Sequence, residues 1–291
     1  GRVPAPGGDR VTGASSNPAL LDPNGNKVVS TSAHELISPW PRIGLKFWGI
    51  LAVVVLIFSW GISGSEAQPG KLIEGFPAIV DIVSRMMPPR IEFWTVTEHF
   101  IETLQMALIG TTGGIILSLP FALLAARNIS PHPIVYQVTR MLLNINRAIP
   151  ELIFALMIVS AVGLGPFGGV VALAVGAVGS LGKLYSEAIE AIDPQQVMAV
   201  RATGANRLLT FMYGVMPQAL PVMLSYSILY LEISVRTATV LGVVGAGGIG
   251  FIIQKYIALF QYDMLFGALI FMAIAVTILD RLSDFLRQRI T

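Results

Sequence analysis

The chain has 291 residues, of which 54% are hydrophobic and only 12% are charged, and its mean hydropathy is +0.72. Soluble domains carry about 25% charged residues, so this composition excludes an ordinary soluble protein and indicates a membrane protein with several spans. A net charge of +2 is too small to indicate nucleic-acid binding, and the absence of cysteine excludes disulfides, thiolate metal sites and cysteine nucleophiles.

The first hundred residues divide into three parts. Residues 1–41 are rich in Gly, Pro, Ser and Asn without helical or strand periodicity, which predicts a flexible tail. The apolar run at 42–62 has Trp48 and Trp60 near its ends and predicts a first membrane span. Residues 63–97 are more polar and are expected to form an outer segment, with an amphipathic surface helix over 76–87 whose start is marked by Pro77.

The rest of the chain, residues 98–291, is predicted to be a helical core. Apolar stretches at 98–126, 135–163, 168–192, 212–241 and 263–286 are each long enough to cross a membrane once, which gives an all-α protein with six transmembrane helices. Small residues recur four apart, as at Gly110 and Gly114 or Ala172 and Gly176. This spacing favours close helix packing, although glycine is also simply common in membrane helices.

The distribution of basic residues predicts the orientation. Six spans place both termini on one side of the membrane. The tail, the loops on that side and the C-terminal end hold most of the Lys and Arg residues, whereas the opposite segments hold only Lys71, Arg85, Arg90 and Lys255. The positive-inside rule therefore predicts a plasma-membrane protein whose termini, and whose loop at 193–211, are cytoplasmic.

Two glycine-rich segments resemble nucleotide-binding loops only superficially. Residues 245–250 match the G-x-G-x-x-G pattern, but the flanking segments are membrane spans and not a βαβ unit. Residues 177–184 lack the first Gly and the final Ser or Thr of a P-loop. No catalytic or metal site is predicted, because His34, His99 and His132 are scattered. The first segment is instead interpreted as a helix break and hinge, formed by Gly242, Gly245, Gly247, Gly248 and Gly250.

Charged residues interrupt two of the predicted spans. Arg147 and Glu151 are four residues apart in the third span, and Glu232 and Arg236 are four apart in the fifth. A charge in hydrocarbon costs at least about 2.5–3.5 kcal/mol, so each pair is expected to form an ion pair along its helix. The pairs predict either a gate or translocation path between helices, or static salt bridges between neighbouring spans.

The loop between the fourth and fifth spans predicts a short helix of its own. Asp193 is a suitable N-cap, Pro194 fits the first helical position, and Gly204 marks the end. Val197 and Val200 give this helix a small apolar face, which indicates docking to a partner or an ordinary interfacial helix.

This loop resembles the E-A-A-x3-G-x9-I-x-L-P loop of bacterial ABC import permeases. The similarity lies in Met198-Ala199-Val200, Gly204 and the closing Pro217, with Met198 in place of Glu, Gly214 in place of Ile and Met216 in place of Leu. The phrases MLLNINRAIPELIFALMIV, EAIEAIDPQQVMAVRATGA and SVRTATVLGVVGAGGIG are similar to the phosphonate-import permease family in particular. This resemblance covers roughly residues 70–290.

The resemblance implies the ABC importer permease fold, with a five-helix core and an extra N-terminal span. It implies a homodimer that works with two copies of a separate ATPase and with an extracytoplasmic binding protein. Phosphonate or a related oxyanion would cross by alternating access, with ATP and Mg bound by the ATPases and no cofactor in this chain. The implied coupling loop comprises Asp193, Pro194, Val197, Met198, Ala199, Val200, Arg201 and Gly204. The gate would lie at Arg147, Glu151, Glu232 and Arg236.

Two alternatives compete with this interpretation. A permease of the methionine-type importers has a similar glycine-rich V-G-A-G-G segment, and an intramembrane enzyme would use Glu151 or Glu232 as an acid or base. For the anion itself, Arg147 or Arg236 offers a bidentate contact. Because each arginine is expected to be neutralised by its own glutamate, the predicted contact is weak or absent, and selectivity is assigned to the binding protein.

Overall fold

The computed structural model describes residues 45–65 and 69–290, and these contain helices and connections but no strand. The predicted tail at 1–41 lies outside the described residues. The chain divides by its contacts into two units, with the boundary between Ile73 and Glu74. The first contains α1 (Leu45–Gly64), which matches the predicted first span.

Helix α2 (Pro69–Arg85) starts earlier than predicted. The sequence placed its start at residue 76, next to Pro77, but Pro77 lies inside the helix. Pro69 occupies the first helical position, where a missing N–H costs nothing, and the helix tolerates the second proline eight residues later at the loss of one backbone hydrogen bond.

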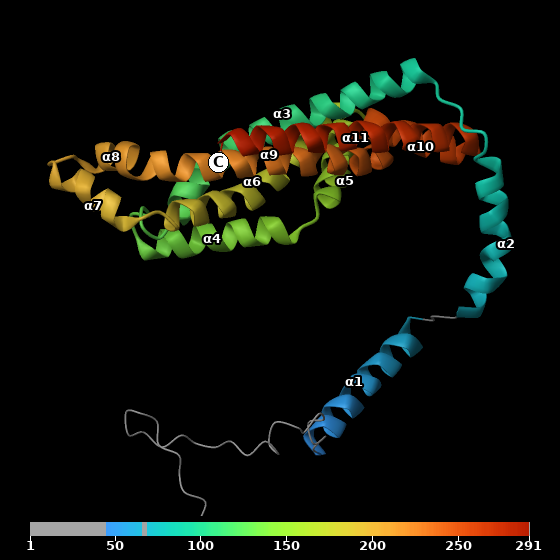
Figure 1. Ribbon diagram of the computed structural model, residues 1–291, viewed down its shortest axis with the longest axis horizontal. Coiled ribbons are helices and arrows are strands. Elements are labelled where there is room, and N and C mark those ends of the chain that lie inside the picture. Colours follow the sequence, from blue (N-terminus) through green and yellow to red (C-terminus); the bar gives the residue numbers. More distant parts are fainter. Residues whose placement is uncertain (1–44, 66–68, 291) are drawn as a thin grey trace, which may run out of the picture. The chain divides into compact units, whose positions relative to one another are not determined.

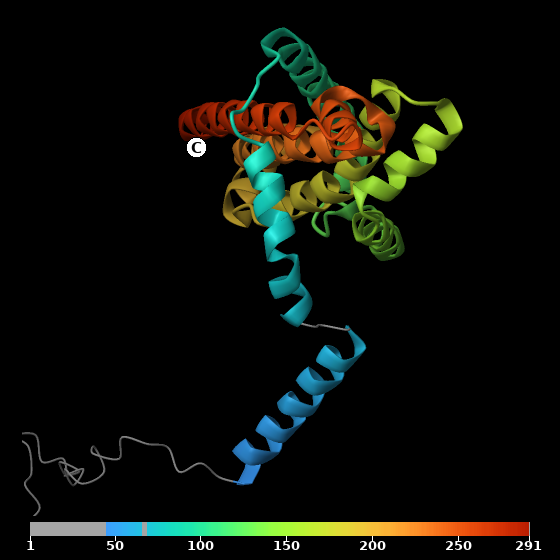
Figure 2. The ribbon, with the colours of Figure 1, turned by 90° about the vertical axis from the view of Figure 1, so that its right-hand side faces the viewer.

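The second unit is an elongated bundle (Figures 1 and 2). Its short helices α7 and α8 lie at one end, and α10 with the beginning of α11 lies at the other (Figure 1). In chain order its elements are α3 (Phe93–Ala125), α4 (Pro133–Ala148), α5 (Glu151–Val162), α6 (Pro166–Glu190), α7 (Pro194–Ala202), α8 (Arg207–Thr210), the π-helical turn η2 (Phe211–Val215), α9 (Met216–Leu241), a second such turn η3 (Gly242–Ala246), α10 (Gly248–Ala258) and α11 (Tyr262–Ile290).

Helices α3 and α6 form the centre of the bundle and lie parallel. A Cβ on Gly114 would overlap the Cβ of Ala177, and one on Gly110 would stand 2.8 Å from the Cβ of Leu173. The predicted use of Gly110 and Gly114 in close helix packing is confirmed. Ala177 and Leu173 are fully buried and belong to the two large apolar clusters of the core.

Five helical segments of the described residues are long and apolar enough to cross a membrane, and a sixth span is formed if the bent pair α4 and α5 counts as one. That pair corrects the prediction of one continuous helix over 135–163. The two helices meet at an angle of 81°, because Pro150 lacks an N–H and forces Ile149 into an extended conformation with φ −92° and ψ 119°.

Candidate functional site

The loop between α6 and α9 folds into a corner of two short helices. The Asp193 carboxylate accepts a hydrogen bond from the backbone N–H of Gln195 at 2.8 Å, and Pro194 occupies the first position of α7. The predicted cap and helix start are confirmed. The backbone N–H of Asp193 also donates to the side-chain carbonyl of Gln218 at 3.0 Å, which ties the start of α7 to α9.

Gly204 turns the chain between α7 and α8. Its φ is +82°, in the left-handed region that residues with a Cβ rarely adopt, and a Cβ there would meet nothing within 4 Å. The predicted helix end near Gly204 is confirmed. Backbone conformation, and not crowding, is what requires glycine at this point.

The apolar face of α7 that the sequence predicted at Val197 and Val200 lies toward η2 and the core, and Val197 also lines the cavity beside this corner. Val197 packs against the apolar core, and a Cβ on Gly214 would stand 3.3 Å from the Val197 Cα. Gly214, a departure from the permease loop pattern, therefore allows α7 to approach η2 closely. The outward surface of α7 carries Met198, Ala199 and Arg201 instead, all of them exposed.

A cavity of about 770 Å³ opens beside this corner. Its lining is mostly apolar and includes charged residues of both signs, Glu190, Arg201 and Arg207. It is lined by Leu123, Asn128, Ile129, Glu190, Ile192, Pro194, Val197, Met198, Arg201, Arg207, Leu208, Thr210, Phe211 and Val215. Such a concave surface of mixed character suits the insertion of a partner's side chains.

The predicted pairing of Glu232 with Arg236 is confirmed and is part of a larger cluster. Arg236 Nη2 lies 2.7 Å from Glu232 Oε1 and also 2.7 Å from Asp280 Oδ2 on α11. Arg287 approaches Glu232 at 3.7 Å. The cluster joins α9 to α11, which run side by side in Figure 1. Asp280 and Arg287 were not predicted, since nothing in one sequence gives the register between two distant helices.

Arg147 and Glu151 do not form the predicted ion pair. The break at Pro150 turns α5 away from α4 by 81°, so the four-residue spacing no longer places the two side chains on one helical face. Glu151 accepts a hydrogen bond from the Tyr230 hydroxyl at 3.3 Å, and its side chain packs where a Cβ on Gly176 would stand. Arg147 is exposed and makes no ion pair with a carboxylate of the described residues.

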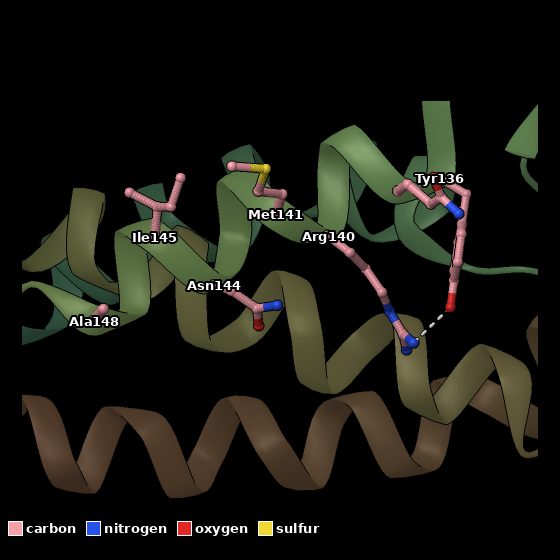
Figure 3. Close-up of a pocket in the computed structure, with 7 residues that line it drawn as sticks. Tyr136, Arg140, Met141, Asn144, Ile145 and Ala148 are labelled. Carbon is pink, nitrogen blue, oxygen red and sulfur yellow. Dashed lines mark hydrogen bonds between the residues drawn. The ribbon is translucent and has the colours of Figure 1, made fainter. Parts of the chain in front are cut away.

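A polar stripe runs along α4 on the face that carries Gln137, Arg140, Asn144 and Arg147. Figure 3 shows Arg140 and Asn144 pointing to the same side of the helix, with the guanidinium of Arg140 donating to the Tyr136 hydroxyl at 2.7 Å. Arg140 also pairs with Glu190 at 3.0 Å. A shallow pocket of about 440 Å³ is lined by Gln137, Arg140 and Asn144 of this stripe, together with Tyr136, Met141, Ile145 and Ala148, and does not include Arg147.

The predicted glycine break is confirmed at the end of α9. Gly245, Gly247 and Gly248 all have positive φ, and the turn η3 departs from helical geometry at Val244 and Gly245. Side chains from α3 satisfy the new N-terminus of α10: Glu102 accepts from the backbone N–H of Gly248 at 3.0 Å, and Thr103 accepts from Ile249 at 2.8 Å. Exposed backbone groups at membrane depth need such partners. Neither partner was predicted.

The far end of the bundle is held by polar contacts. Arg90 reaches Asp263 at 3.5 Å, and the Tyr256 hydroxyl donates to Glu92 at 3.3 Å. Burial, and then the Glu92 carboxylate, raises the pKa of Tyr256 above its usual value, so this hydroxyl stays protonated and remains a donor at physiological pH. Within residues 45–65 and 69–290 no group of three His, Asp or Glu side chains is placed to share a metal ion.

Comparison with known proteins finds similarity over most of the chain. Residues 118–291 match the family described as binding-protein-dependent transport system inner membrane component. The phosphite transport system permease protein PtxC of Stutzerimonas stutzeri is 37% identical over 252 residues, which are 84% of this chain and 91% of that protein. The phosphate-import permease protein PhnE of Mycolicibacterium smegmatis is 39% identical over 217 residues, 74% of this chain but 41% of that longer protein.

A solved structure supports the same fold. An inward-facing conformation of the MetNI methionine ABC transporter matches with a TM-score of 0.60 at 24% sequence identity. The match covers 68% of this chain and 97% of the matched chain.

Proposed function

This chain belongs to the family of binding-protein-dependent transport system inner membrane components and is the permease subunit of an ABC importer, and from that premise we propose that its solute is a phosphorus oxyanion. Phosphite is named for one relative and phosphate for another, each at more than a third identity. The chain is a transport component and not an enzyme, so the intramembrane-enzyme alternative is rejected.

The methionine alternative is not favoured. Its support is the similarity to the MetNI structure, which at 24% identity indicates the fold alone. The oxyanion proposal is supported instead by the similarity to PtxC over 84% of this chain.

The subunit is a multi-pass inner-membrane protein, and its family works with ATPase subunits and a binding protein. We propose in addition that two copies form a homodimer, that two ATPases bind it and supply ATP and Mg²⁺, and that both termini are cytoplasmic. The orientation rests on the excess of Lys and Arg in the predicted inner segments.

The corner of α7 and α8 is proposed as the coupling loop. Two observations support this: exposed Met198 and Arg201 line a cavity that suits a partner, and α7 packs through Val197 onto the core. Movement of a docked ATPase would therefore reach the α9 span through η2, which α7 contacts at Gly214. The paired charges of α9 and α11 and the α4–α5 break are proposed to border the path, and the glycine break at 242–250 is proposed as the hinge.

The substrate is tested by reconstituting the permease with its ATPase and binding protein. Phosphite, phosphonate or phosphate is expected to stimulate ATP hydrolysis and to be taken up, whereas methionine is expected to do neither. Stimulation by methionine but by none of the three oxyanions would overturn the substrate assignment.

Replacing Gly204 with valine is expected to uncouple transport from ATP hydrolysis. A β-branched residue resists a φ of +82°, so the corner must reorient, yet a Cβ meets no neighbour and the rest of the fold is spared. Uptake should fall by about tenfold or more, the effect of about 1.4 kcal/mol, while ATPase activity persists. The matched control is Gly204→Asn, because asparagine tolerates the left-handed region. Equal uptake by Gly204→Val and wild type would remove Gly204 from the coupling role.

A further inference from the structure

The polar stripe of α4 leads from one end of the core toward its middle. Gln137, Arg140, Asn144 and Arg147 follow one another at intervals of three and four residues, the spacing of one helical face. Arg140 lies beside Glu190, the last residue of α6. Arg147 lies beside Gly179, near the centre of α6, where a Cβ would stand 3.0 Å from its backbone nitrogen. Since α6 is a membrane-span candidate, Arg147 lies at mid-span depth.

An exposed guanidinium at that depth does not face lipid. Charged side chains within spans face the bundle interior or a water-filled cavity, because hydrocarbon does not solvate them. Gln137 and Asn144 on the same face are also exposed, so the whole stripe requires a polar environment. A lipid headgroup is not the partner, because headgroups lie at the membrane surface and not beside the centre of a span.

Within residues 45–65 and 69–290, Arg147 differs from Arg140 and Arg236 in having no carboxylate as a counter-ion. Arg140 is paired with Glu190 at 3.0 Å, and Arg236 is held between Glu232 and Asp280 at 2.7 Å each. The carboxylate that the sequence offers to Arg147 is Glu151, which the Pro150 break directs to Tyr230. The break therefore leaves a positive charge at mid-span whose complement is an anion.

We infer that Arg147 is a transient contact for the transported oxyanion, its guanidinium donating two hydrogen bonds to two oxygens of the tetrahedral phosphorus group. This rests on the proposed function and assigns a residue to it. A single cation on an exposed stripe binds weakly, and weak binding at mid-span suits a step from which the anion must leave again. The neighbouring Asn144 supplies a neutral donor on the same face.

The test compares uptake of labelled phosphite by the complete reconstituted transporter carrying Arg147→Gln or Arg147→Lys. Arg147→Gln is expected to lower uptake by about tenfold or more, the loss of one charge-assisted bidentate contact, while the loaded binding protein still stimulates ATP hydrolysis. Lysine keeps the positive charge but lacks the planar guanidinium that donates two parallel hydrogen bonds, so uptake by Arg147→Lys should be intermediate. The control is Arg85→Gln on α2, which removes an exposed arginine paired with Asp81 and should leave uptake unchanged.

A second measurement separates charge from structure. The natural chain has no cysteine, so Arg147→Cys provides a single thiol. Modification with a water-soluble aminoethyl thiosulfonate, which restores a positive charge, is expected to restore uptake, whereas the sulfonatoethyl reagent should not. The control is the wild-type permease treated with each reagent, because it offers no thiol to modify.

Wild-type uptake by Arg147→Gln would overturn the inference, as would equal rescue by both reagents. If Arg147→Gln fails to assemble with the ATPase, the Arg147→Lys variant decides the question. Assembly with reduced uptake supports the contact, whereas assembly with full uptake refutes a bidentate contact from the guanidinium. If wild type itself carries no phosphorus oxyanion, the substrate assignment fails, a result distinguishable from every Arg147 outcome.

Discussion

Replacing Arg236 with glutamine is expected to remove most of the assembled permease from the membrane. The guanidinium neutralises Glu232 and Asp280 together, so its loss removes the nearest cation from both carboxylates and leaves Glu232 with Arg287 at 3.7 Å. The Glu232 side chain is only 14% exposed, which leaves it little water for compensation. Breaking a buried ion pair by removing one partner costs about 3–5 kcal/mol, and because the Arg236 side chain is 47% exposed, the expected cost lies at or below the lower end of that range. Such a cost is still a large part of the stability of a typical domain. The measurement is the amount of monodisperse permease extracted in mild detergent.

The relative stability of the single, double and triple variants tests whether charge compensation explains the loss. Arg236→Gln with Glu232→Gln removes one of the two carboxylates that Arg236 neutralises, and the triple variant that adds Asp280→Asn removes both. We therefore expect the single variant to be the least stable and the triple variant to recover most of the loss, because replacing paired charges by neutral groups is often tolerated. Arg287 then keeps its charge, with Asp284 at 3.7 Å. If all three variants lose equal amounts of extracted permease, the cluster stabilises the permease through side-chain packing and not through charge compensation.

Gly250→Ala is expected to be the most damaging single methyl addition in the core. A Cβ at Gly250 would overlap the backbone carbonyl oxygen of Thr239 and stand 2.9 Å from the Cα of Gly242. Backbone atoms cannot rotate aside as a side chain can, so α10 must separate from α9. Overpacking in a dense core costs typically about 1–3 kcal/mol, and contact with backbone on two sides favours the upper end.

The matched control for this change is Gly113→Ala on α3. There a Cβ would meet the Cβ of Ala174 at 3.6 Å, an ordinary van der Waals contact, and alanine favours helix over glycine. We expect Gly113→Ala to keep or raise the thermal midpoint of the purified permease and Gly250→Ala to lower it by several degrees, following about 2–4 °C per kcal/mol for chains of this size. Similar midpoints for the two variants would contradict the close approach of α10 to α9.

Local signals in the sequence were sufficient for most of the helices. Apolar length gave the spans, because a helix that crosses a bilayer must be apolar over about 20 residues wherever it packs. Asp193, Pro194 and Gly204 gave the limits of α7, because caps act within a few residues of themselves. The helix break at Gly245 to Gly248 was visible for the same reason: glycine at positive φ is a property of the residue.

Pairings across helices could not be predicted in this way. The four-residue spacing of Glu232 and Arg236 held because α9 is continuous there, while the same spacing failed for Arg147 and Glu151 because Pro150 separates two helices at 81°. Asp280 joined Arg236 from 44 residues away, and Glu102 capped Gly248 from 146 residues away. Neither sequence separation corresponds to the periodicity of a helix, so spacing alone could not predict these contacts.

The amino-acid sequence by itself determined the membrane class, the extent of the spans, the capped helix between α6 and α9 and the glycine break, since each depends on side chains within one or two helical turns. Only the tertiary structure decided which charges are neutralised, which face of α7 is outward and that exposed Arg147, beside the middle of α6, makes no ion pair within the part of the chain that the structure describes. The physical reason is that an ion pair needs two atoms within about 4 Å, and helix packing, not sequence separation, sets that distance.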